Sequence, residues 1–142
     1  MTFKYLTQLD LDTGIFSTLQ KERSDEDTQA ILREIEAQNI ALIKTKMKGR
    51  YDVEKIFEAT AAERHYLIIK ILVVLVVYQF IRRNAARKVP ADTVKDYNWA
   101  MMLLEKIRAG KEQPDGLPLQ TVNGAPIEKV AWANTMNPDN YI

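Results

Sequence analysis

The chain has 142 residues, of which 46% are hydrophobic and 27% charged, and these proportions are typical of one globular domain with its own core. Lys and Arg number 20 against 19 Asp and Glu, so the formal net charge of +1 provides no overall field for a nucleic acid or an acidic membrane, although a local patch can still bind one. The absence of cysteine and the single histidine, His65, exclude disulfides, thiolate chemistry and clustered histidine metal sites, and we expect neither a cofactor nor an enzyme activity.

The N-terminal third predicts a short helical lead-in followed by a long helix. Acids and Gly14 interrupt the apolar residues of the first twenty positions, which also lack the pattern of a signal peptide. Ser24 and the three acids after it indicate a helix start, because they can accept from early backbone N–H groups and favour the positive end of the helix dipole. We expect this helix to run to about Lys48, to end at a Gly49 cap, and to be followed by a connector over residues 50–57.

A second, strongly apolar helix is predicted next. Thr60 begins a capping-box pattern and Pro90 forces a stop, so we expect the helix to run from Thr60 to about Lys88. Its apolar stretch, residues 66–81, is shorter than the roughly 20 residues that span a membrane, and it contains Lys70. We interpret it as a buried core helix, with Lys70 either reaching the surface along its aliphatic stem or pairing with an acid of a neighbouring helix.

A third helix is expected to begin close to Ala91 and to end at Gly110. Apolar side chains recur along it at helical spacing and so form a single stripe, which is typical of a helix that packs through one face. The glycine, followed by Pro114, is the usual sequence signature of a helix end.

The chain changes character after this helix. Four of the five prolines lie in the last segment, and Asn123-Gly124 between two apolar runs predicts a β-hairpin, with Pro126 confined to an edge position. We therefore expect an all-α fold with three main helices and a short N-terminal helix in residues 1–113. An extended C-terminal arm, residues 114–142, would carry the local hairpin.

The order of these elements is familiar. A helix that ends in Lys48-Gly-Arg-Tyr51 is followed by a long apolar helix and by a closing helix of the form Tyr97-Asn-Trp-Ala100 … Leu104-Glu-Lys-Ile-Arg-Ala-Gly110. This pattern, over roughly residues 4 to 117, resembles the phage head–tail connector (adaptor) proteins, in particular the group named for the Mu-type prophage structural protein.

The resemblance implies a mechanical role. Members of this family are small helical proteins that assemble as a ring, usually twelve-fold, beneath the portal protein, where they extend the DNA channel and offer a docking surface to the next neck or tail protein. The chain would then be a virion protein of the head–tail junction, present in the host cytoplasm before assembly. Its partners would be copies of itself, the portal protein, a neck or tail protein, and DNA that passes without sequence readout, with no membrane involved.

One candidate for DNA contact is the basic run that closes the second helix. It consists of Arg82, Arg83, Arg87 and Lys88. These side chains either contact DNA phosphates on a channel wall or complement the dipole of the helix end. The same residues would serve the alternative function, a small helical regulatory or DNA-binding module, which predicts salt-sensitive binding to free DNA.

The C-terminal arm carries the candidate interface residues. They are apolar or aromatic side chains in a proline-rich segment: Val122, Ile127, Val130, Trp132, Tyr141 and Ile142. The arm either adds a strand or an aromatic anchor to a neighbouring copy, or folds back over its own helices and completes the core. His65 is interpreted as a surface or helix-start residue and not as half of an acid–base pair with Glu63, because residues two apart on a helix do not face each other.

Overall fold

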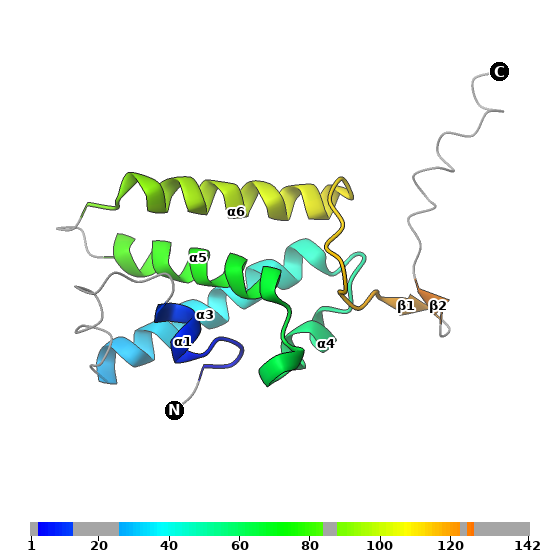
Figure 1. The fold of residues 1–142 in the computed structure, drawn as a ribbon, viewed down its shortest axis with the longest axis horizontal. Helices are drawn as coiled ribbons and strands as arrows, with labels where there is room; N and C mark the ends of the chain where they lie inside the picture. Colours follow the sequence, from blue (N-terminus) through cyan, green and yellow to red (C-terminus); the bar gives the residue numbers. More distant parts are fainter. Residues whose placement is uncertain (1–2, 13–25, 84–87, 123–124, 127–142) are drawn as a thin grey trace, which may run out of the picture.

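The computed structural model describes residues 3–12, 26–83, 88–122 and 125–126, and these are mainly helical, which confirms the predicted all-α fold (Figure 1). In chain order the elements are α1 (Gln8–Asp12), α3 (Glu26–Met47), α4 (Val53–Glu58), the 3-10 turn η1 (Ala61–Glu63), α5 (Tyr66–Arg82), α6 (Ala91–Ala109), β1 (Thr121–Val122) and β2 (Ala125–Pro126).

Helices α3, α5 and α6 form a bundle in which each contacts the other two (Figure 1). Helix α5 runs opposite to α3 and α6, so the C-terminal ends of α3 and α6 lie at the same end of the bundle. The short helix α1 packs on α5, and α4 packs on α3. As a result, α5 is covered from several sides.

The core is built mainly around α5. Ten of its 17 residues are buried, which confirms that the apolar stretch is a core helix: Ile68, Ile69, Ile71, Leu72, Val73, Leu75, Val76, Val77, Phe80 and Ile81. A polar link also joins α3 to α5, since the buried side-chain amide of Asn39 donates to the side-chain oxygen of Gln79 at 2.8 Å. Within the described part of the chain, no helix has the length and apolar character needed to cross a membrane.

Helix α6 begins and ends where the sequence predicts. Its buried residues, Thr93, Ala100, Leu104 and Ile107, recur on one face. Gly110 ends the helix with a left-handed backbone, φ 82°, and a Cβ at this position would stand 2.8 Å from Nη2 of Arg50. Both the dihedral angle and the close approach therefore require glycine here.

The end of α3 differs from the prediction. The helix stops at Met47, but Gly49 does not adopt the left-handed backbone of Gly110, and the Tyr51 N–H continues the turn by donating to the Met47 carbonyl at 3.1 Å. The segment predicted as a connector then contains α4, because the side chain of Asp52 caps that helix by accepting from the backbone N–H of Lys55. A glycine cap is not needed when the chain turns directly into another capped helix.

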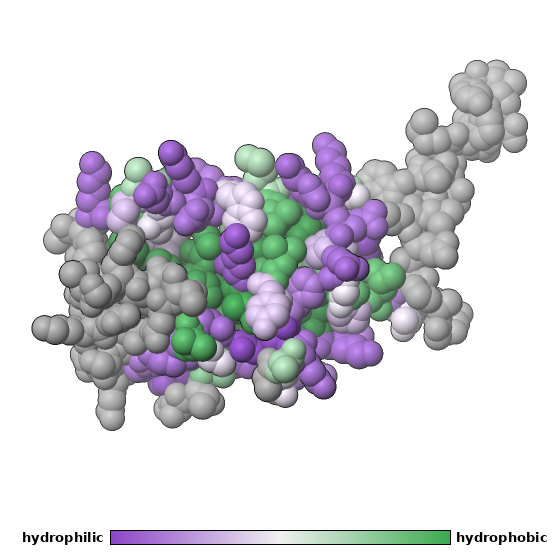
Figure 2. All heavy atoms as spheres, in the orientation of Figure 1, coloured by the Kyte–Doolittle hydropathy of each residue, from purple (hydrophilic) through white to green (hydrophobic). Residues whose placement is uncertain are grey.

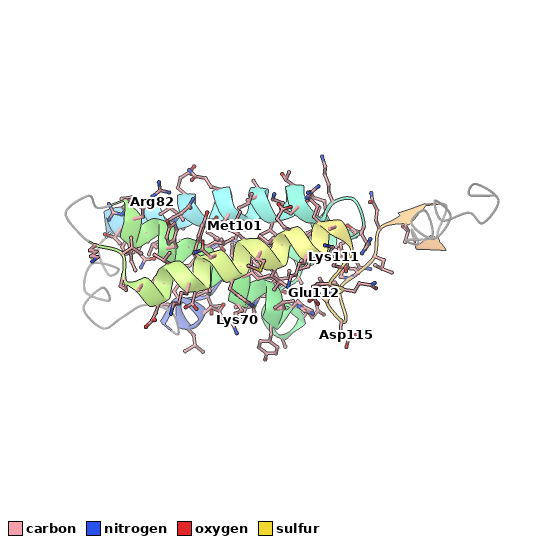
Figure 3. The ribbon with its side chains drawn as sticks, turned by 90° about the horizontal axis from the view of Figure 1, so that it is seen from above. Lys70, Arg82, Met101, Lys111, Glu112 and Asp115 are labelled. Carbon is pink, nitrogen blue, oxygen red and sulfur yellow. The ribbon has the colours of Figure 1, made fainter. Side chains whose placement is uncertain are left out.

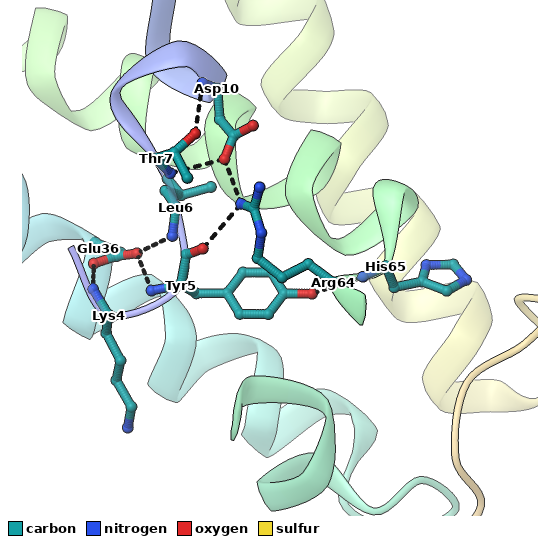
Figure 4. A network of polar contacts seen from close by, with 8 residues as sticks. All are labelled: Lys4, Tyr5, Leu6, Thr7, Asp10, Glu36, Arg64 and His65. Carbon is teal, nitrogen blue, oxygen red and sulfur yellow. Dashed lines mark hydrogen bonds and ion pairs between the residues drawn. The ribbon is translucent and has the colours of Figure 1, made fainter. Parts of the chain in front are cut away.

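The predicted start of the second helix is wrong. The capping-box pattern at Thr60 produces only the turn η1, and α5 begins at Tyr66. The reason is that the two intervening residues are held by the N-terminal segment (Figure 4). Arg64 donates to the carbonyl of Tyr5 at 3.0 Å, and the backbone N–H of His65 donates to the Tyr5 hydroxyl at 3.0 Å. The helix also ends earlier than predicted, at Arg82, and Lys88 is not helical.

A buried carboxylate fixes the N-terminal segment to α3. Glu36 is 1% exposed and accepts the backbone N–H groups of Lys4, Tyr5 and Leu6 at 2.8, 2.9 and 2.7 Å (Figure 4). Hydrogen bonds to a charged acceptor are stronger than those between neutral groups. This single side chain thereby satisfies three consecutive backbone donors and holds the segment across the bundle.

A second polar contact ties this segment to the turn before α5. The Asp10 carboxylate accepts from Arg64 at 2.5 Å and from the Thr7 backbone N–H at 2.8 Å. Burial raises the pKa of Asp10, but these partners outweigh it, and the net result is a pKa below the ordinary value. Burial also raises the pKa of the Tyr5 phenol. Together with Glu36, these groups cover one side of α5.

The first part of the C-terminal arm contacts the helical body. Leu117 is buried in the core, the backbone N–H of Asp52 donates to the Pro118 carbonyl at 2.9 Å, and that of Gln120 donates to the Arg50 carbonyl at 2.8 Å. Strands β1 and β2 then pair in antiparallel fashion, Thr121 with Pro126 and Val122 with Ala125, whereas the second apolar run of the predicted hairpin, residues 127–132, lies outside the described residues. The base of the arm thus belongs to the fold of its own chain.

Candidate functional site

The predicted basic run lies at the end of the bundle where α5 ends and α6 begins. Arg82, which Figure 3 labels, is exposed there, and so is the next residue, Arg83. The Arg82 guanidinium lies 6.0 Å from the ring centre of Tyr78, and that of Arg83 lies 4.9 Å from the ring centre of Phe80. Each guanidinium can cover an aromatic ring and still present donors to solvent.

This position fits both interpretations of the run. Arg82 is in the last turn of α5, where a cation complements the partial negative charge of the helix end. Lys88 is exposed in the segment before α6, and Arg87 lies outside the described residues. The exposed cations are also accessible to a phosphate group, so the geometry does not separate a dipole role from a DNA contact.

Most of the predicted interface residues of the arm lie outside the described part of the chain. Val122 belongs to strand β1, but its side chain is among those not described. The same holds for all atoms of the other candidates, Ile127, Val130, Trp132, Tyr141 and Ile142. The prediction that these side chains contact a neighbouring copy therefore stays a prediction.

The structure reveals an exposed aromatic face that the sequence analysis missed. Lys70 on α5 contacts Trp99 on α6, Tyr66 lies one helical turn before Lys70 and Met102 about one turn after Trp99, and we call these four residues the α5–α6 face. Tyr66 is 86% exposed, Met102 58% and Trp99 39%. Figure 2 shows apolar surface between these two helices, crossed by hydrophilic side chains. Large apolar side chains that gather on one face are typical of a surface that contacts another molecule.

Lys70 takes part in this face, and no acid among the residues that the structure describes forms a salt bridge with it. It is exposed, as one of the two predictions requires, and its Nζ lies 5.0 Å from the centre of the Trp99 ring (Figure 3). A cation over an indole ring gains about 0.5–1 kcal/mol at an exposed site. The available sequence signal was a lysine in one predicted helix and a tryptophan in the next. Their contact forms only because these two helices pack side by side.

His65 lies on a groove of about 580 Å³ between the turn η1 and the base of the arm. Glu63 lines the same groove, but the imidazole Nε2 donates to the carbonyl of Asp115 at 2.6 Å. With Nε2 as the donor, the neutral imidazole carries its lone pair on Nδ1, which is buried and has no hydrogen-bond partner within the described part of the chain. The arrangement places His65 at the helix start, as predicted, where it contacts the arm.

A second basic group lies at the opposite end of the bundle from Arg82. The C-terminal ends of α3 and α6 enclose a cleft of about 360 Å³ whose lining includes four cationic side chains: Lys46, Lys48, Arg50 and Arg108. Sequence reasoning missed this group because Arg108 lies about sixty positions after the other three cations and joins them only in the folded chain. The alternation of cations from Lys44 to Arg50 was the available signal.

Local charges around this cleft are partly paired. Glu105 accepts from Lys46 and from Arg108, and these hydrogen bonds lower the pKa of Glu105. Burial raises the pKa of the Tyr51 phenol, while the charge of Arg50 opposes that shift.

Among the residues with described positions, no group of three or more His, Cys, Asp or Glu could hold a metal ion. No family model, curated protein or solved structure matches this chain.

Proposed function

We propose that this chain is a structural head–tail connector (adaptor) subunit of a tailed phage or prophage-derived particle, and that it acts without catalysis. The order of the described helices supports this proposal. Helix α3 leads into Gly49-Arg50-Tyr51, α5 is a long apolar helix, and α6 closes at Gly110. These are the elements on which the resemblance to that family rests.

The observation that carries the proposal is the α5–α6 face. Three of the five exposed large apolar side chains in the described part of the chain, Tyr66, Trp99 and Met102, belong to this face, and the other two are Leu9 on α1 and Leu119 in the arm. In a ring of more than two copies each subunit uses two different surfaces, one for each neighbour. The α5–α6 face suits one of these surfaces, and the part of the arm beyond Pro126 suits the other.

The full proposal is a homo-oligomeric, twelve-fold ring that sits between the portal protein and a neck or tail protein and extends the DNA channel. DNA passes through without sequence readout. The protein is located at the head–tail junction of the virion and in the host cytoplasm before assembly. A chain with this role needs a rigid body and contact surfaces, and the tightly packed α5 core supports such a body.

Fractionation of particles tests the proposal. Particles and soluble protein from producing cells are separated on a density gradient, and each fraction is probed for the chain after stringent washing. We expect the chain to remain with particles that contain the portal protein. If it is absent from every particle and stays in the soluble fraction, the connector proposal is contradicted.

The arm supplies a variant for the same experiment. We expect Trp132→Ala to weaken incorporation into particles more than it lowers the free energy of unfolding, because an external anchor contributes to an interface and not to the core. Thermal unfolding of the isolated variant is the control. An equal loss of folding and incorporation would show that Trp132 belongs to the core of its own chain.

The second candidate is a small helical regulatory or DNA-binding module. The exposed Arg82 and Arg83 favour it, since both present charged donors at one end of the bundle. It predicts a chain that stays soluble and binds free DNA through this end. The particle fractionation separates the two functions without relying on DNA affinity.

A further inference from the structure

The cleft between the C-terminal ends of α3 and α6 has an unusual charge. Among its lining residues that the structure describes, four carry a positive charge and none is acidic. Outside the cleft, Lys106 and Lys111 add exposed cations on the last turn of α6 and just beyond it. This concentration contrasts with a formal charge of only +1 for the whole chain.

The partial negative charges at the helix ends offset only part of this positive charge. The C-terminal ends of α3 and α6 each carry a partial charge of about −0.5, and the Glu105 carboxylate adds one negative charge. These sum to about two negative charges against the four lining cations. Glu105 pairs with Lys46 and Arg108, whereas Lys48 and Arg50 form no salt bridge with the acids that the structure describes, so these two cations are available to a bound anion.

Arg50 provides a specific donor in the cleft. Its Nη1 is buried and has no hydrogen-bond partner within the part of the chain that the structure describes. Its Nη2 lies against Gly110, so the guanidinium is held in place by the end of α6. One guanidinium nitrogen of Arg50 is thus without a partner, and guanidinium N–H groups are strong donors to phosphate oxygens.

We propose that this cleft binds phosphate groups of a nucleic-acid backbone. A polymer with regularly spaced charges can contact Arg50 and Lys48 in the cleft and the exposed lysines outside it at the same time, whereas a single small anion cannot. The contacts would be to phosphates and would not read sequence. The cleft is complete within one chain, so the inference goes beyond the proposed ring function and does not depend on it.

Binding of the full chain to a short fluorescently labelled DNA duplex, followed by anisotropy over a series of NaCl concentrations, tests the proposal. The double variant Lys48→Gln/Arg108→Gln removes two cleft charges, and the matched control Lys4→Gln/Lys95→Gln removes two exposed charges that lie outside the cleft. We expect the cleft variant to bind about tenfold more weakly and to lower the slope of log affinity against log salt by roughly 0.9 per lost contact. The control should keep the wild-type affinity and slope.

Arg50→Lys is a second variant, which keeps the charge but removes the guanidinium group. We expect it to weaken binding less than the double variant, with unfolding curves showing that all variants fold. The proposal is overturned if the wild type does not bind DNA at low salt, or if both double variants weaken binding equally. It is also overturned if inorganic phosphate or polyglutamate displaces DNA at equal total charge, because the ligand would then be a small anion or an acidic protein.

Incorporation of Lys48→Gln/Arg108→Gln into particles keeps this inference separate from the proposed function. If the chain is a connector whose ring contacts lie elsewhere, this variant enters particles normally even though it binds DNA weakly. If the chain never enters particles but its cleft binds DNA, the connector proposal fails and the phosphate-binding cleft stands.

Discussion

Helices α5 and α6 have similar lengths, 17 and 19 residues, yet they are buried in different ways. Ten residues of α5 are buried, against four of α6. Helix α5 is apolar on nearly every side and is covered by α3, α6 and α1, whereas α6 packs through one face and leaves Trp99 and Met102 exposed on another. The comparison separates a helix that stabilises the body from a helix that presents a surface.

Burial of α5 on most of its sides has a consequence for the N-terminal segment. The bundle helices α3 and α6 cannot cover all of α5, and the remaining side is closed by α1 and the residues before it. Glu36 and Arg64 hold that segment in place (Figure 4). The stability of α5 therefore depends on polar contacts made outside α5 itself.

The largest effect is expected for a truncation inside α5. Leu75 is fully buried, so Leu75→Ala removes apolar contacts and leaves a cavity, and it should lower the free energy of unfolding by about 2–5 kcal/mol. Met102→Ala on α6 is the matched control and should change stability by no more than about 0.5 kcal/mol. Chemical denaturation measures both. Equal losses would contradict the distinction between the two helices.

Removing the carboxylate that holds the N-terminal segment comes next. Glu36→Ala leaves three backbone N–H groups without their acceptor and uncovers one side of α5, at an expected cost of roughly 2–3 kcal/mol. Hydrogen exchange should show faster exchange at Tyr5 and Leu6. The control is Glu34→Ala on the exposed side of α3, which should be nearly neutral. Unchanged exchange in the Glu36 variant would show that another contact holds the segment.

Two glycines near one end of the bundle offer a smaller contrast. Gly110→Ala forces a side chain into a left-handed backbone beside Arg50, and it should cost about 1–2 kcal/mol or more. Gly49→Ala meets no atom within 4 Å and has no positive φ, so it should be neutral or stabilise by up to about 1 kcal/mol. Gly110→Ala should lower the melting temperature, whereas Gly49→Ala should leave it unchanged or raise it. A neutral Gly110→Ala would contradict the described helix end.

The smallest effect concerns pH. The pKa of Asp10 is below its ordinary value of 3.8 in the folded chain, so its stabilising contribution is present above that value and is lost as pH falls through the folded pKa. Asp10→Asn should remove this acid-dependent part, which we expect to be about 1 kcal/mol or less. Unfolding curves at neutral and acidic pH measure it. An unchanged pH profile would show that Asp10 does not contribute.

Sequence periodicity predicted α3, α5 and α6 because each has an apolar pattern longer than ten residues, and the end at Gly110 was predicted because glycine and proline mark it together. The start of α5 was not predicted, since the pattern at Thr60 is local whereas the contacts of Arg64 are made with residues near the N-terminus. Local patterns compete with tertiary contacts, and here the tertiary contacts determine where the helix begins.

The candidate sites show the same contrast between local sequence patterns and tertiary contacts. Arg82 and Arg83 were found because they are adjacent in the sequence. The cleft that contains Lys48 and Arg108 was not, because it forms only when two parallel helices end together. The contact of Lys70 with Trp99 likewise depends on how α5 and α6 lie against each other. Sites built from one segment can be predicted from sequence, and sites built across segments require the helix arrangement.

The number of copies per particle tests the central claim most directly. Purified, washed particles are analysed by quantitative mass spectrometry, with the portal protein as the internal standard for one ring. The connector proposal predicts about a dozen copies of this chain, comparable to the number of portal subunits, because a closed ring contains a fixed small number of copies. Complete absence, or a number in proportion to the capsid shell, would contradict a ring at the head–tail junction.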